Sequence, residues 1–176
     1  MLTKTTISAI RALIYLGLSA SGRPLSPRQI ADALGESPTY MSKITGQLVR
    51  AGILRAHRGV VGGVTFQCLP QEITLLAIME ACQRMELAAF CEVAPDLSKT
   101  CAFHQAAVEL QEAVVSVMSR WTLDRLLSRP HPIGRSHKSI PCWMESIPKL
   151  PTRPSRQLAA RKPRESRAKK RRVGVK

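Results

Sequence analysis

The sequence of 176 residues has no run of about 18 apolar residues, no Cys-x-x-Cys pair and no glycine-rich phosphate-binding loop. The first absence excludes a helix that spans a membrane. The other two, with the lack of obviously paired carboxylates, argue against a thiol redox enzyme, and we expect no enzymatic activity. The five cysteines are odd in number and widely spaced, which disfavours a disulfide framework and favours a cytoplasmic location.

Acidic residues are scarce in one part of the chain. The whole sequence has 27 Lys and Arg against 12 Asp and Glu, a net charge of +15. Of these charged residues, 15 basic and 2 acidic ones lie in residues 128–176, so the excess of positive charge lies in a Pro-, Arg- and Lys-rich tail. The tail has no apolar periodicity, and we expect it to be disordered. The excess of positive charge favours a polyanionic partner, either nucleic acid or an anionic membrane surface.

Two short helices around a glycine form the first motif. Ser26 is followed three residues later by Gln29, which is a capping-box sequence, and the helix that it opens is expected to end at Gly35. Ser37 is expected to cap a second helix that reaches about Ala51. This pattern predicts a helix-turn-helix, although a three-helix core that binds nothing would share it.

The second of these helices has two different faces. Met41, Ile44 and Leu48 follow helical spacing and should face the core. The opposite face is polar without being acidic, as a helix in a DNA major groove requires. Its residues are Thr39, Ser42, Lys43, Gln47 and Arg50.

A hairpin is predicted directly after this helix. Residues 53–56 and 64–69 have the pattern of short strands, and the glycine-rich stretch 58–63 supplies the tip. A hairpin in this position is a wing. Its Arg58 could enter a narrow minor groove, or it could be an ordinary solvated charge.

Helical periodicity returns after the wing. Thr74 is expected to cap a helix over about 75–84, and a long helix is expected over about 103–127. The long helix has a narrow apolar seam of the coiled-coil type, which a partner helix would cover, although an intrachain core would also bury it. The seam is Ala107, Leu110, Val114, Val117 and Trp121.

Six separated motifs in residues 3–127 resemble the winged-helix bacterial regulators of the IscR/NsrR type. They are Arg11-Ala-Leu13, Ser37-Pro-Thr-Tyr40, Leu48-Val-Arg-Ala-Gly-Ile-Leu54, Arg58-Gly-x-x-Gly-Gly63, Glu72-Ile-Thr-Leu75 and Cys101-Ala-Phe-His104. The resemblance implies a homodimer on a partly palindromic operator, with the long helices crossing at the interface. It also implies base-reading roles at the start of the recognition helix for Ser37, Thr39 and Ser42, and a minor-groove role for Arg58. Ser37 could instead serve only as the helix cap.

The resemblance also implies a sensor site before the long helix. Cluster-binding members have three cysteines there; Cys91 and Cys101 match the first and the last, and no cysteine lies between them. His104 lies at a position that is a ligand in some relatives. The implied cofactor is a [2Fe–2S] cluster held by Cys91, Cys101 and His104, with Glu92 or Asp96 as a further candidate. A Cys91–Cys101 disulfide that senses oxidants, and thiols with no sensing role, are the alternatives.

We therefore expect a mainly α-helical fold with a small β-wing. Its parts are a winged helix-turn-helix DNA-binding domain (1–72), a sensor loop with a long dimerisation helix (73–127) and a disordered basic tail (128–176). The expected function is a DNA-binding transcriptional regulator, a repressor that senses redox, iron–sulfur or nitric oxide status. Its partners would be double-stranded operator DNA and a second copy of the chain, and no membrane. The alternative is a protein that coats nucleic acid non-specifically through its tail, on a winged-helix dimer scaffold.

Overall fold

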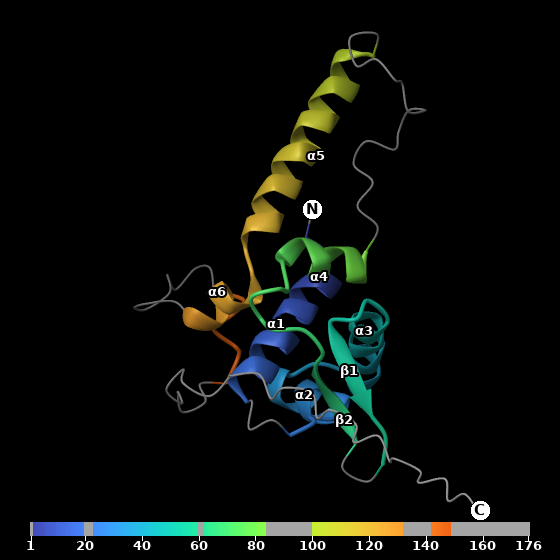
Figure 1. Ribbon diagram of the computed structural model, residues 1–176, viewed down its shortest axis with the longest axis vertical. Coiled ribbons are helices and arrows are strands. Elements are labelled where there is room, and N and C mark those ends of the chain that lie inside the picture. Colours follow the sequence, from blue (N-terminus) through green and yellow to red (C-terminus); the bar gives the residue numbers. More distant parts are fainter. Residues whose placement is uncertain (1, 20–22, 60–61, 84–99, 132–141, 149–176) are drawn as a thin grey trace, which may run out of the picture.

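The structure is a computed structural model in which residues 2–19, 23–59, 62–83, 100–131 and 142–148 are described. The helices are α1 (Lys4–Leu18), α2 (Pro27–Leu34), α3 (Pro38–Arg50), α4 (Leu75–Cys82), α5 (Ala102–Arg120) and α6 (Leu123–Ser128). The strands are β1 (Leu54–His57) and β2 (Gly63–Phe66), which pair antiparallel. The expected mainly helical fold with a small β-wing is confirmed (Figure 1).

Helix α1 lies at the centre of the core. It packs against α2, α3, α4 and α6. Its apolar stripe of Ile10, Leu13 and Ile14 is almost completely buried, as helical spacing predicts. The core therefore forms around the first helix, and the later helices cover its sides.

The helix-turn-helix begins with the predicted capping box. The Ser26 hydroxyl accepts a hydrogen bond from the Gln29 backbone N–H (3.2 Å), and Gln29 Oε1 accepts one from the Ser26 N–H (2.8 Å). Helix α2 ends at Gly35, whose φ of 66° is a left-handed conformation that glycine adopts without a steric penalty. These local interactions fix the turn that leads into α3.

The wing is connected to the loop before α2. Residues 54–57 of β1 pair with 63–66 of β2, within one residue of the predicted starts. Leu25 makes an additional antiparallel bridge with Val64 through two backbone hydrogen bonds (2.8 and 3.2 Å). A Cβ on Gly63 would lie 2.5 Å from the backbone of Leu25, so only glycine permits this close approach.

The prediction of a single long helix over 103–127 is wrong in one respect, because the helix is broken between α5 and α6. At the break Trp121 is extended, and its carbonyl accepts a hydrogen bond from the Leu75 N–H (2.8 Å). The Leu123 N–H in turn donates to the Ile73 carbonyl (2.8 Å). The backbone at 121–123 thus pairs with the segment before α4, which removes it from the helical hydrogen-bond series.

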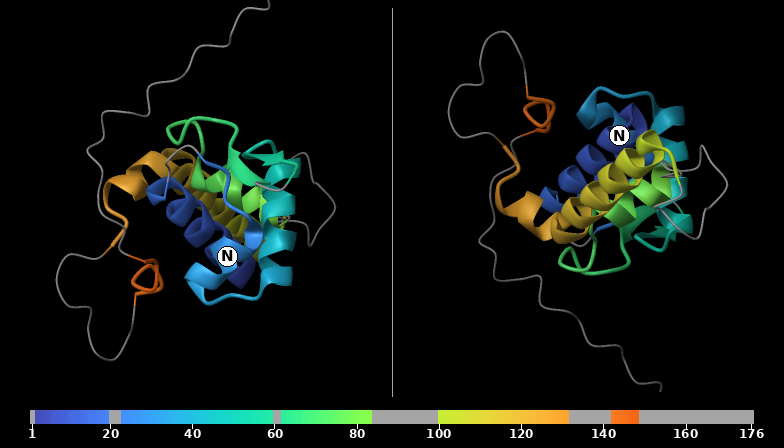
Figure 2. Two further views of the ribbon diagram at one scale, coloured as in Figure 1. Left: turned by 90° about the horizontal axis from the view of Figure 1, so that it is seen from below. Right: turned by 90° about the horizontal axis from the view of Figure 1, so that it is seen from above.

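Helix α5 projects from the domain, at the opposite end of the molecule from the wing (Figure 1). It packs against α4, and in the view from above it lies in front of the helices of the domain (Figure 2, right). Of its expected seam, Leu110 (53%), Val117 (42%) and Trp121 (42%) are exposed in the described part of the chain, while Ala107 and Val114 are partly buried. No helix among the described residues is both long and apolar enough to cross a membrane.

A short segment of the expected tail packs on the domain. Residues 142–148 form turns, and Ile147 is 1% exposed within the hydrophobic core. For this segment the expectation of disorder is wrong, because an apolar side chain fills the core beside α1. The remainder of the expected tail beyond residue 131 lies outside the described residues.

Candidate nucleic-acid interface

Helix α3 exposes the polar face that its sequence predicts. Met41, Ile44 and Leu48 are fully buried. Most of the predicted DNA-contacting residues are exposed on the other side of the helix: Thr39, Ser42, Lys43 and Arg50. No acidic residue occurs in α3.

Ser37 lies at the N-cap of α3, where it was expected, but it does not cap the helix through its side chain. Its carbonyl accepts a hydrogen bond from the Met41 N–H (2.9 Å), while its hydroxyl makes no capping hydrogen bond. The side chain is exposed at the start of the helix. The interpretation of Ser37 as a side-chain cap alone therefore has no support in the geometry.

Gln47 differs from the other predicted residues of this face. It is only partly exposed, and its Oε1 is buried without a hydrogen-bond partner among the described residues. A buried unpaired amide oxygen costs free energy, so the position is not that of a simple solvated residue. Thr45, also polar, is buried, and its hydroxyl donates to the Met41 carbonyl (3.0 Å).

The wing carries two exposed arginines. Arg58 follows β1 directly and is exposed, as predicted. Arg55 within β1 is exposed as well, and the sequence analysis did not single it out. Period-two alternation from the buried Leu54 would have placed Arg55 on the outer face of the strand. His57 lies on the same strand, and its Nε2 is 2.8 Å from Thr65 Oγ1 on β2.

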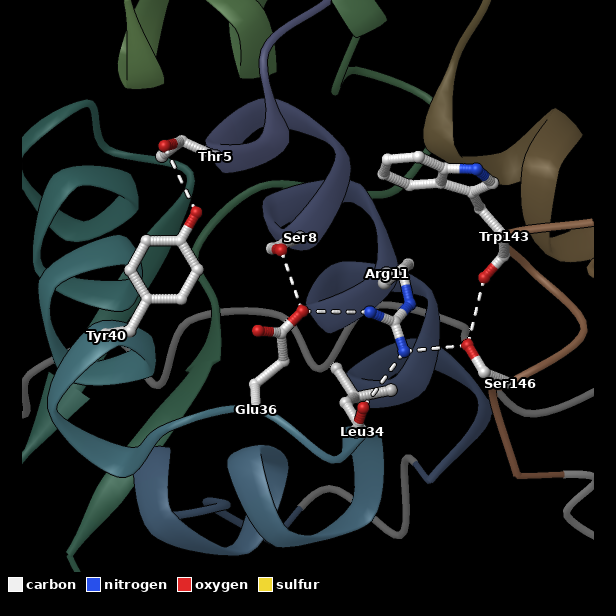
Figure 3. Close-up of polar contacts among 8 residues, drawn as sticks. All are labelled: Thr5, Ser8, Arg11, Leu34, Glu36, Tyr40, Trp143 and Ser146. Carbon is white, nitrogen blue, oxygen red and sulfur yellow. Dashed lines mark hydrogen bonds and ion pairs between the residues drawn. The ribbon is translucent and has the colours of Figure 1, made fainter.

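A network of buried polar groups positions the turn between α2 and α3 (Figure 3). Arg11 on α1 forms an ion pair with Glu36 in this turn, with 2.9 Å between Nη1 and Oε1. Arg11 Nη2 also donates to the Leu34 carbonyl (3.0 Å), and the Ser8 hydroxyl donates to Glu36 Oε1 (2.9 Å). The start of α3 is held separately, because the Tyr40 hydroxyl donates to Thr5 Oγ1 (3.2 Å).

The predicted sensor residues are only partly described. Cys101 is the exposed N-cap of α5, and His104 follows three residues later in the first turn and is 7% exposed. The two residues thus differ in environment, with the Cys101 side chain in solvent and the His104 side chain buried. Cys91, Glu92 and Asp96 lie outside the described residues, and within the described ranges no three His, Cys, Asp or Glu side chains come close enough to hold a metal ion.

Cys68 and Cys82, which lie outside the predicted sensor site, are both partly buried. The Cys68 thiol donates a hydrogen bond to the Gly52 carbonyl (3.4 Å). Burial raises the pKa of Cys82 from 9.0 to about 11, so its thiol stays protonated at neutral pH. A protonated, half-buried thiol is a poor metal ligand and a poor nucleophile.

A helix-turn-helix followed directly by a two-stranded hairpin is a winged-helix fold. Residues 2–129 match the Rrf2 family, which is described as an iron-dependent transcriptional regulator, and the chain belongs to this family. The expected kinship with IscR-type regulators is thereby confirmed.

Solved structures share the fold. CymR, the global cysteine regulator of B. subtilis, is 23% identical with a TM-score of 0.59, over 73% of this chain and 96% of that chain. IscR of T. potens is 17% identical with a TM-score of 0.59, over 77% of this chain and 93% of that chain. CymR of Staphylococcus aureus is 22% identical with a TM-score of 0.57, over 74% of this chain and 100% of that chain. At these identities the likeness establishes the fold alone.

Proposed function

We propose that this transcriptional regulator is a repressor that binds a partly palindromic operator as a homodimer. The observation that carries the proposal is the exposed side of α3, which is polar and contains no acidic residue. A helix of this kind suits the major groove. The exposed Arg55 and Arg58 lie on the adjacent wing, where they would meet phosphates or a narrow minor groove.

Each proposed contact follows from the position of the residue. The first turn of α3 would read base edges, because the N-terminal residues of a recognition helix approach the groove floor. Lysine and arginine further along the helix would contact phosphates. Gln47 would contact DNA only after its half-buried amide turns outward. The proposed set is Ser37, Thr39, Ser42, Lys43, Gln47, Arg50 and Arg58.

The variant Arg58→Ala tests the wing. We expect it to weaken binding to the DNA upstream of the protein's own gene by about 1–3 kcal/mol, the range of a good groove contact. Arg120→Ala is the matched control, because Arg120 is an exposed arginine at the end of α5, outside the helix-turn-helix, the wing and the basic segment. Equal affinities of the parent and the Arg58→Ala protein at matched salt would show that the wing does not contact DNA.

The second candidate function is non-specific coating of nucleic acid through the basic segment. The charge of residues 128–176 favours it, because Lys and Arg clusters gain affinity by releasing counterions. The two functions differ in a competition experiment between the upstream DNA and random duplex of equal length. Equal affinities across a series of salt concentrations would favour coating, and a preference for the upstream DNA would favour the operator-binding repressor.

The proposed dimer interface is the uncovered seam of α5. Leu110 and Val117 on α5, and Trp121 directly after the helix, are large apolar side chains that are at least 42% exposed. A second α5 with the same seam would cover them in a two-fold arrangement.

Because α4 and α6 share the core of α1, the proposed border between residues 72 and 73 separates functions rather than folding units.

The proposed signal site is Cys91, Cys101 and His104. Of these, Cys101 is the N-cap of α5 and His104 lies in its first turn, so a ligand held there would act on the same helix that carries the dimer seam. A [2Fe–2S] cluster would supply redox chemistry at this site. The chain's own residues would provide a thiolate at Cys101 and an imidazole nitrogen at His104, and mixed Cys and His ligation of this cluster type exists.

Protein purified without oxygen tests the signal site. We expect iron, sulfide and visible absorption, and we expect Cys101→Ala to abolish the absorption. Cys68→Ala is the control, because that thiol donates its hydrogen bond to the Gly52 carbonyl and lies outside α5 and the predicted sensor site. An iron-free, colourless protein whose operator binding responds neither to oxidant nor to Cys101→Ala would contradict the proposal. Iron-free protein that responds to oxidant through a Cys91–Cys101 disulfide would favour thiol sensing instead.

A further inference from the structure

Helix α3 has a glycine in its interior, Gly46, on the side of the helix that faces away from the core. Gly46 follows Ser42 by four residues and precedes Arg50 by four, so it lies between these two exposed side chains on one face of the helix. The exposed Lys43 lies beside it, one turn earlier. Gly46 is therefore in the middle of the polar face that is proposed to bind DNA.

Nothing within the described chain requires a glycine at this position. Glycine is unfavourable in the interior of a helix, because it loses more backbone freedom on folding than any other residue. The backbone of Gly46 is helical, and among the described residues a Cβ there would meet only Arg50 Nη1, at 3.8 Å, which is an ordinary van der Waals contact. An alanine would therefore fit the folded chain without displacing an atom.

The other glycines of the described chain each have a reason within the fold. Three of them have a positive φ, of 66° to 109°, which side chains rarely adopt: Gly35, Gly52 and Gly59. At three more, a Cβ would lie within 2.8 Å of another atom of the chain: Gly17, Gly62 and Gly63. Gly17 gives the direct contrast, because it also lies in a helix and its Cβ would be 2.7 Å from Leu127. Among the described glycines, Gly46 alone has neither reason.

We propose that Gly46 is the point at which duplex DNA approaches the backbone of α3 most closely, so that the missing side chain lets the helix enter the major groove. The proposal rests on the DNA-binding function proposed above and names a residue that sets the depth of docking. Glycine is the residue that permits close approach of a backbone to a ligand. The surroundings suit a polyanion, since Lys43 and Arg50 are exposed cations and α3 has no acidic residue.

The dimensions of the groove make one side chain important. A helix with its side chains is about 10–12 Å across, and the major groove is about 12 Å wide. Because little space remains, bulk on the middle of the groove-facing side pushes the helix outward. Hydrogen bonds to base edges weaken steeply when their atoms separate beyond about 3.2 Å, so a small outward shift is costly.

Bulk at position 46 should therefore have opposite effects on the fold and on binding. In the free protein, alanine replaces an unfavourable helical residue and adds no clash, so the fold becomes more stable. In the complex, the added methyl group occupies space that the duplex needs. A residue with a purely structural role would not move stability and affinity in opposite directions.

The test measures urea unfolding and duplex affinity for the full-length parent, Gly46→Ala and Gly46→Leu, on the upstream DNA and on random duplex at one salt concentration. Ser119→Ala and Ser119→Leu are the matched controls, because Ser119 is exposed on α5, outside the helix-turn-helix and the wing. We expect Gly46→Ala to raise the urea midpoint and to lower affinity for the upstream DNA roughly fivefold or more, the loss that accompanies one mismatched base pair. Gly46→Leu should lower affinity further, and the controls should bind as the parent does.

Three results would overturn the proposal. Parental affinity in both Gly46 variants would show that the duplex does not approach position 46. A loss confined to Gly46→Leu would place the duplex at side-chain distance from the helix. A lower urea midpoint for Gly46→Ala would show that the fold of the chain itself requires the glycine.

The outcome is separable from that of the proposed function. Operator recognition is judged on the parent alone, as its preference for the upstream DNA over random duplex. A parent without this preference would remove the operator, and the affinities of the two Gly46 variants for random duplex would still decide the close approach. A parent that prefers the upstream DNA, together with Gly46 variants that bind equally well, would keep the function and remove the close approach.

Discussion

The ion pair between Arg11 and Glu36 should stabilise the turn before the recognition helix, and Glu36→Gln tests it. The two side chains are 11% and 13% exposed, so both charges are almost completely removed from water. Glu36 Oε1 accepts hydrogen bonds from both Arg11 and Ser8. Replacing the carboxylate by an amide keeps the shape but leaves the guanidinium without its counter-charge.

The magnitude follows from what remains in place. Removal of one partner from a buried ion pair costs about 3–5 kcal/mol, because the other charge stays buried and uncompensated. Arg11 keeps its bonds to the Leu34 carbonyl and Ser146, and the amide oxygen of glutamine can still accept. We therefore expect a loss of about 2–3 kcal/mol in the free energy of unfolding.

Urea unfolding followed by circular dichroism measures this loss, at one fixed protein concentration because association adds to stability. Asp32→Asn on α2 is the matched control, since Asp32 is exposed and its change should stay within about 0.5 kcal/mol. The cycle is completed by Arg11→Met and the double variant, whose loss should be smaller than the sum of the single losses by about 1–2 kcal/mol. Additive losses, or a Glu36→Gln effect no larger than that of the control, would refute the reasoning.

Two further predictions concern α5 and the thiols. Leu110→Glu, at a seam position that is 53% exposed, should weaken the dimer about tenfold or more, because it places like charges at the two-fold interface. Sedimentation measures the dimer affinity, and Ser119→Glu on the other side of α5 is the control. An unchanged dimer in Leu110→Glu would contradict the proposed interface. Iodoacetamide at pH 7.5 should alkylate the exposed Cys101 of iron-free protein much faster than Cys82, because burial raises the pKa of the Cys82 thiol to about 11. Mass spectrometry of the peptides measures the two alkylation rates, and equal rates would contradict the prediction.

The parts of the fold that depend on neighbours in sequence could be predicted. The capping box of Ser26 and Gln29, the stop at Gly35 and the cap at Thr74 involve residues only a few positions apart, and all are present. The buried face of α3 follows from helical spacing in the same way. Such features are decided by local geometry, which the sequence states directly.

The break between α5 and α6 could not be predicted because its cause is a tertiary contact. Apolar spacing continues from Ala107 to Trp121 as in one helix, and no Gly or Pro interrupts it. The backbone near Trp121 instead pairs with Ile73 and Leu75, about 47 residues earlier in the chain. Local propensity cannot reveal a strand-like pairing at such a distance.

The candidate site was predictable in its exposed residues and not in its supporting ones. Helical spacing places Met41 on the buried face of α3, so the exposure of Thr39, Ser42 and Lys43 on the opposite face could be predicted. The half-buried amide of Gln47 and the Arg11–Glu36 pair depend on which element covers each side chain. Sequence spacing places a residue on a face, but only the packed fold decides whether that face meets water.

The packed segment at residues 142–148 changes how the basic end of the chain should be studied. From composition alone, a deletion of residues 129–176 would be expected to remove positive charge and nothing else. The same deletion removes Ile147 from the core and the Ser146 contact of Arg11, which also holds Glu36 before α3. A loss of DNA affinity after that deletion would combine lost phosphate contacts with a loosened recognition helix. Because the cations after residue 148 follow this packed segment in the sequence, neutralising them in place changes the charge and leaves every described contact of the helix-turn-helix present.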